Sequence, residues 1–251
     1  MQVNYPSFRA PRRIGGFTLL EILIALFIGL FLMVALLTIV QANRTVFGNQ
    51  NKLTQMQDGE RMAMTMIADV IQSAGYFPDP TTNTSTTSLT AAGPFAAGQA
   101  ISGSYSATAP GDQISVRYMT AGGDGILNCS GQSNPVGAPN TLYVNSFQVL
   151  NGQLVCTMNG TQYNLVNGIT NMSLLYGVKT SAGAAGNNVD TYMNASQLTP
   201  AQWGSVISVL VQLTFTNPLY VAGQPTNGAI NQQTTTLQRV VDVMNQTGPV
   251  Q

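Results

Sequence analysis

An uncharged apolar run of 19 residues, 22–40, constrains this chain more than any other feature. As an α-helix rising about 1.5 Å per residue, the run extends roughly 28 Å, close to the hydrocarbon thickness of a bilayer. Two small residues, Gly15 and Gly16, and a single carboxylate, Glu21, stand directly before it. The segment therefore predicts a membrane-spanning helix with an unusual N-terminal end.

The order of features before this run differs from that of an ordinary secretory leader. Such a leader begins with basic residues, continues with an apolar stretch and is cut after that stretch at small residues. Here Gly15 and Gly16 follow Arg12 and Arg13 and precede the apolar run. A cut at this pair would remove only a short basic leader and keep the anchor on the mature protein.

The segment GFTLLE, residues 16–21, resembles the class III signal of type IV pilins and pseudopilins. The resemblance implies that a prepilin peptidase of the inner membrane cuts after Gly16 and that the new N-terminal residue, Phe17, is N-methylated. Glu21 then becomes the fifth residue of the mature chain. This is the characteristic acidic position of the family.

A carboxylate at the start of a membrane helix needs a physical reason. An isolated ionised Glu inside the bilayer costs several kcal/mol, even when it reaches toward the interface. The resemblance supplies a partner, the amine of Phe17 on the same or a neighbouring subunit, so that Glu21 acts as an assembly charge. The alternative is a Glu21 that lies at the lipid headgroup level of a plain signal anchor.

The distribution of charged residues predicts the orientation of the chain in the membrane and argues against nucleic acid as a partner. Only 7% of residues are charged, and without Arg9, Arg12 and Arg13 the acidic residues outnumber the basic ones. A chain with no basic face is not expected to bind nucleic acid. The same three arginines precede the anchor, which predicts a cytoplasmic N-terminus and a periplasmic domain.

Cys129 and Cys156 are the only cysteines. An even count in an exported domain favours a disulfide, and a chain without His offers too few ligands for a zinc site. The closed loop of 28 residues predicts a stabilisation of the order of 3.6 kcal/mol. Two free buried thiols are the alternative.

The anchor continues as a helix with an apolar face. Beyond residue 40, apolar residues recur at steps of three and four, and Gly75 followed by Pro78 predicts the end of the helix. The apolar positions of this face are Leu53, Met56, Ala63, Ile67, Val70 and Ala74. We therefore expect a leader at 1–16, a transmembrane helix at 17–40, an amphipathic extension at 41–77 and a globular domain at 78–251.

In the remainder of the chain, apolar and polar residues alternate in segments, as in antiparallel strands. The Thr-, Ser-, Ala- and Gly-rich composition of residues 79–110 predicts a long surface loop that is either wrapped over the domain or partly mobile. Asn151-Gly152 predicts a hairpin turn. The expected strands cover residues 113–119, 141–149, 153–158, 169–176, 206–215 and 237–243. A long helix followed by such strands predicts an α+β fold in which one sheet packs on the amphipathic half of the helix.

Catalytic and ligand-binding groups are sparse. The sequence has no His, and its acidic residues form no convincing catalytic pair, so we expect no enzyme activity and no cofactor or metal. The GGDG segment at 122–125 lacks the Lys-Ser/Thr of a phosphate loop and predicts a turn. The methionines at 62, 64 and 66 are spread around a helix by their alternate spacing, so we expect them to be packing or surface residues.

Further segments, in order along the chain, resemble the PilW-type minor pilins of type IV pili. They include DGERMAMTMIADVIQSAGYF, GDQISVRY, LVNGITNMSLLYGV and VISVLVQLTF. The resemblance implies a type IV pilin-like fold, a disulfide between the paired cysteines and a role in pilus assembly and twitching motility. The stretches 181–188 and 218–228 look like local insertions of unassigned role.

The function implied by the resemblance is priming of a type IV pilus, or a place in its tip complex, through helix packing. The implied partners are other minor pilins, the major pilin, a tip adhesin, prepilin peptidase and inner-membrane lipid. The protein would then reside in the inner membrane and later in the pilus. The alternative is a J-type minor pseudopilin of a type II secretion system, which shares the leader, anchor and fold.

Overall fold

The computed structural model describes residues 15–180, 188–226 and 231–244, and the chain divides into two compact units, 1–51 and 52–251. Each unit is considered by itself. The predictions that concern Arg9, Arg12 and Arg13, most of the leader, nearly all of the stretch 181–188 and the end of the stretch 218–228 lie outside the described residues.

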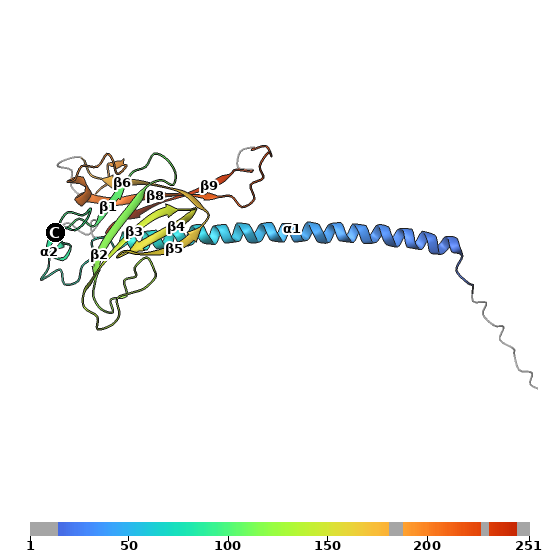
Figure 1. The fold of residues 1–251 in the computed structure, drawn as a ribbon, viewed down its shortest axis with the longest axis horizontal. Helices are drawn as coiled ribbons and strands as arrows, with labels where there is room; N and C mark the ends of the chain where they lie inside the picture. Colours follow the sequence, from blue (N-terminus) through green and yellow to red (C-terminus); the bar gives the residue numbers. More distant parts are fainter. Residues whose placement is uncertain (1–14, 181–187, 227–230, 245–251) are drawn as a thin grey trace, which may run out of the picture. The chain divides into compact units, whose positions relative to one another are not determined.

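The helix α1 is a single element of 54 residues, Leu19–Gln72 (Figure 1). It contains a window with a mean hydropathy of 3.1, so it is long and apolar enough to cross a membrane. Its buried residues all lie in the last third and recur at helical spacing: Ala63, Met64, Ile67, Ala68, Val70 and Ile71. The helix ends at Gln72, three residues before the predicted stop at Gly75 and five before the expected end of the extension at residue 77. Gly75 adopts a φ of 78°, and its amide donates to the carbonyl of Arg117.

The strands form two antiparallel sheets. The first sheet has the order β1-β2-β3-β4-β5, with strands Ile101–Ser104, Gln113–Thr120, Thr141–Leu150, Gln153–Met158 and Thr161–Asn167. The second has the order β7-β6-β8-β9, with β6 Ile169–Val178, β7 Thr191–Met193, β8 Val206–Thr216 and β9 Thr234–Asp242. Two short helices complete the elements, α2 Ser85–Ser88 and the 3-10 helix η1 Gln202–Ser205.

The two sheets share one core. Strand β6 contacts β2, β3 and β4 of the first sheet, and the buried end of α1 belongs to the same cluster of apolar side chains. Asp112, itself buried, stands at the seam. Its carboxylate accepts from the amide of Leu174 at 2.7 Å and from that of Ser106 at 2.8 Å, which fixes the start of β2 against β6.

The expected α+β class is confirmed. The six expected strands are also present, and each of their ends lies within three residues of the predicted position. Asn151 and Gly152 both have positive φ, as the predicted hairpin turn requires. The division into two sheets and the strands β1, β5 and β7 were not predicted. These three strands are short or expose most of their side chains, so they lack an alternating apolar pattern.

The long loop after α1 is tied down by one buried cation. Arg117 on β2 is fully buried, and its guanidinium donates to four backbone carbonyls at 2.5 to 3.1 Å. The accepting carbonyls belong to Leu89, Thr90, Ala96 and Gln99. The guanidinium also lies 4.7 Å from the ring centroid of Phe95. Burial lowers the pKa of Arg117, and the four carbonyls compensate for its lost hydration.

Candidate functional site

The N-terminal end of α1 carries the residues that the sequence singled out. Thr18 immediately precedes the helix, and its side-chain oxygen accepts from the amide of Glu21 at 3.3 Å. In return, the carboxylate of Glu21 accepts from the amide of Thr18 at 3.4 Å. This reciprocal pair is a capping box, which satisfies amides at the first turn that have no partner within the helix.

The capping box was missed at the level of the sequence, although its signal is present. A Thr followed three residues later by Glu, just before an apolar run, is the pattern that predicts it. The structure therefore gives Glu21 a local role that the resemblance did not imply. Both hydrogen bonds of its carboxylate are long, at 3.4 Å, and the residue is exposed, so Glu21 can still accept a stronger donor.

An exposed face of the helix runs on from this carboxylate. Phe17, Glu21, Ala25, Gly29 and Met33 follow one another at steps of four and border a shallow groove. Ala25 and Gly29 are small, and a Cβ added at Gly29 would meet no atom within 4 Å. Small residues on an apolar helix let a second helix approach closely, which favours association inside a membrane.

Large apolar side chains surround this face and remain exposed in the isolated chain. Ile22, Leu26 and Leu30 border the same groove and expose 53%, 68% and 64% of their surface, and Phe17 exposes 80%. Exposed apolar surface on this scale marks a contact with lipid or protein. The face can thus do two things chemically: bury apolar surface in a membrane and offer one carboxylate to a cation at the start of the helix.

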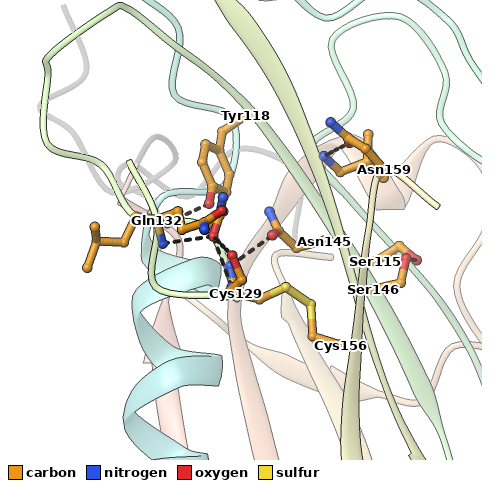
Figure 2. The surroundings of a disulfide bond; sticks show 12 residues. Ser115, Tyr118, Cys129, Gln132, Asn145, Ser146, Cys156 and Asn159 are labelled. Atoms are coloured by element: carbon orange, nitrogen blue, oxygen red, sulfur yellow. Dashed lines mark hydrogen bonds between the residues drawn. A yellow bond between two sulfur atoms is a disulfide. The ribbon is translucent and has the colours of Figure 1, made fainter. Parts of the chain in front are cut away.

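The predicted cysteine pair is joined in the globular unit. Cys129 is bonded to Cys156 on β4, with their Cα atoms 6.3 Å apart, and neither residue is a free thiol (Figure 2). The amide of Cys129 donates to Asn145 at 3.0 Å, and the hydroxyl of Tyr118 donates to the carbonyl of Leu127 at 2.7 Å. The disulfide and these bonds hold the loop between β2 and β3, residues 121–140, against the first sheet.

The other segments considered at the level of the sequence have structural roles. Asp124 of the GGDG segment accepts from the amides of Ala121 and Ile126, and this arrangement forms the expected turn. Among the methionines, Met64 is buried and Met62 is exposed, so they do not converge on one point. In the described residues, no group of three or more His, Cys, Asp or Glu side chains could hold a metal ion.

Two family models match separate parts of the chain. The model described as Prokaryotic N-terminal methylation motif matches residues 11–37, which include Gly16, Phe17 and Glu21. The model described as Type IV Pilus-assembly protein W matches residues 132–247, from the disulfide loop through β9. The two matches support a PilW-type minor pilin. This family is one of structural proteins of the type IV pilus, and its methylation motif marks a membrane-anchored component.

Other comparisons add little to this assignment. A comparison with curated protein sequences finds no significant match. Among solved structures, a type IV-like pilin from Thermus thermophilus is 12% identical to this PilW-type chain, with a TM-score of 0.42. The alignment covers 77% of this chain and 98% of that one.

Proposed function

We propose that this PilW-type pilin is cut after Gly16, N-methylated on Phe17 and joined to other pilins through parallel packing of α1. Its leader would be removed by prepilin peptidase, its helix would lie in the inner membrane and its globular unit would lie in the periplasm. The neighbours would be other minor pilins, the major pilin and a tip adhesin. The complex would lower the barrier to starting a pilus.

The observation that carries this proposal is the carboxylate at the first turn of an exposed apolar helix. Removal of the leader would create a charged amine on Phe17, four residues from Glu21. A neighbouring helix that enters the exposed face would bring its own amine to the same level of the membrane. An ion pair between subunits there would compensate for the cost of a carboxylate near hydrocarbon.

The capping box provides a matched control for this role. Glutamine at the third helical position preserves a capping box but carries no charge. If Glu21 only caps the helix, Glu21→Gln should behave like the wild type and Glu21→Ala should not. We expect both variants to recover the other minor pilins about tenfold less well from solubilised membranes, which corresponds to about 1.4 kcal/mol. Normal recovery with Glu21→Gln would leave capping as the role.

Processing is tested by the mass of the full-length gene product purified from membranes. We expect a mature chain that begins with methylated Phe17, and Gly16→Ala should be processed only in part because the cleavage site requires a small residue. A bulkier residue at position 16 should block processing. Any other N-terminus in the wild type would contradict the proposed cleavage.

Deletion of the gene separates a pilus role from the secretion alternative. We expect surface pili and twitching motility to be lost or sharply reduced while type II secretion continues. Exoproteins trapped in the periplasm, with normal pili, would instead indicate a J-type minor pseudopilin.

A further inference from the structure

One edge of the second sheet is long and has no neighbouring strand among the described residues. Exposed sheet edges are templates for pairing with another strand, and proteins commonly shorten or bulge them. β1 and β7 have only four and three residues, and β5 carries a register shift opposite Leu154 and Val155. β9, by contrast, pairs with β8 over nine residues without a shift. We call the free side of Thr234–Asp242 the β9 edge.

The backbone groups of the β9 edge can be assigned from its register. The amide of Val243 donates to Ile207, and that of Asn217 donates to Gln233, so a hydrogen-bonded pair lies just beyond each end of the strand. Antiparallel pairs alternate between bonded and unbonded residues. The free amides and carbonyls therefore belong to Thr234, Thr236, Gln238, Val240 and Asp242. No described strand other than β8 pairs with β9.

The side chains of β9 also extend beyond the core. Val211, Leu213 and Phe215 of β8 are at most 1% exposed. Their direct partners on β9 are Arg239, Leu237 and Thr235, of which Arg239 and Thr235 are exposed and Leu237 is half-buried. Directly opposite residues lie on the same face of a sheet. On this face of β9 the core includes Val241 and part of Leu237, whereas the stretch that carries Arg239 and Thr235 is open to a further strand.

Arg239 gives the β9 edge a chemical preference. The chain has three lysines or arginines after residue 61, and Arg239 is the one that is exposed, because Arg117 is buried and Lys179 is half-buried. Its guanidinium has no hydrogen-bond or ion-pair partner among the described residues. A charge at this position excludes strands that cannot compensate for it and favours one that carries a carboxylate.

The β9 strand of a second copy of the chain would not place a carboxylate opposite Arg239. If two β9 strands paired antiparallel about Gln238, Arg239 of each copy would lie diagonally opposite Arg239 of the other. Diagonal neighbours remain within reach of long side chains, so the two like charges would repel. The occupant is therefore a strand of different sequence.

We propose that the β9 edge accepts an extended strand from a different, neighbouring pilin, with a carboxylate side chain facing Arg239. This inference rests on the proposed function, because helices packed in parallel would hold neighbouring globular units alongside one another. Such tethering makes a second contact effectively intramolecular, so a short strand suffices. Backbone hydrogen bonds would supply affinity, and Arg239 would supply selectivity.

Two pairs of variants separate the backbone from the charge. Gln238→Pro removes an outward amide and spares the bonds to β8, because edge strands accept proline where the amide faces solvent. Gln238→Thr changes the side chain and keeps the amide. Arg239→Glu reverses the charge, whereas Arg239→Lys preserves it. Thermal unfolding and the intact disulfide show whether each full-length variant is folded.

The measurement is co-purification of each full-length variant from membranes of piliated cells, with antibodies against the other minor pilins and the major pilin. We expect Gln238→Pro and Arg239→Glu to lose at least one of these pilins by about tenfold, and the two controls to retain it. If Gln238→Pro does not fold, Arg239→Glu and its lysine control decide the test.

Equal recovery by a folded Gln238→Pro and the wild type would overturn the strand contact alone. If the wild type recovers none of these pilins, the proposed function and the strand contact both fail. Recovery of a differently tagged second copy, lost in Gln238→Pro, would also overturn the inference, because the occupant would be this chain itself.

Discussion

At the scale of single residues, a buried arginine holds one long loop of the globular unit in place. Arg117 holds carbonyls that are 18 to 28 residues away in the sequence, and no carboxylate of the described residues pairs with it. Sequence analysis could predict the strand that carries Arg117 from its alternating pattern. It could not predict the burial of this charge, because the compensating groups are backbone carbonyls of a distant loop.

We expect Arg117→Ala to destabilise the globular unit by about 2–4 kcal/mol, because several buried carbonyls lose their donor at once. Arg117→Lys should recover only part of this loss, since an ammonium cannot match the fork of a guanidinium. Chemical unfolding of the full-length chain in detergent measures both effects. Proteolysis within residues 78–99 provides a second readout. Wild-type stability and resistance in Arg117→Ala would contradict this role.

Glu60 allows a prediction about pH. One oxygen of its carboxylate is buried with no hydrogen-bond partner among the described residues, and burial raises the pKa of Glu60. A raised pKa means that the folded chain holds the proton more tightly than the unfolded chain. This group's contribution to stability therefore falls as the pH rises from the unfolded pKa through the folded one.

Glu60→Gln should accordingly stabilise the protein at pH 7, by less than about 1 kcal/mol because solvent screens the partly exposed group. The gain should disappear below pH 4, where the wild type is also neutral. Unfolding curves at the two pH values measure the difference. A variant that is less stable than the wild type at pH 7 would show that the charge has a favourable partner.

At the scale of elements, the sequence predicted what a strong local pattern encodes. α1 and the strands β2, β3, β4, β6 and β8 have clear apolar periodicity, and their positions were predicted closely. β5 has one buried residue, Val166, and β9 is mostly exposed. The existence of β5 and the ends of β9 were therefore harder to infer. Edge strands contact solvent on more than one side, and the alternation that marks a half-buried strand is weak there.

The disulfide ties one irregular element to the first sheet. Replacing both Cys129 and Cys156 by Ser should cost about 3–4 kcal/mol, because the unfolded chain regains the freedom of a loop of 28 residues. The loss should appear as early opening of the loop 121–140, followed by β4. Hydrogen exchange of the oxidised wild type and the double variant measures this order. Equal protection in both would indicate that the hydrogen bonds of Tyr118 and Asn145 suffice.

At the scale of the whole molecule, the two units are encoded in different ways. The candidate site at the start of α1 is local, since Gly16, Phe17 and Glu21 lie within six residues, and sequence analysis could identify it. The β9 edge depends on a register between strands and on where the core ends, and neither is written in a short motif. The methylation motif of the anchor can therefore be found in the sequence, whereas the β9 edge can be found only in the structure.

A molecule that primes a filament should act on the start of pili and not on their growth. Deletion of the gene together with that of the retraction motor distinguishes these roles. A priming defect lowers the rate at which filaments begin, so blocking retraction should let the few that start accumulate. We expect pili to return in part in the double deletion, and counting filaments per cell by electron microscopy measures this. Complete absence of pili without retraction would contradict a priming role and indicate an obligatory structural part.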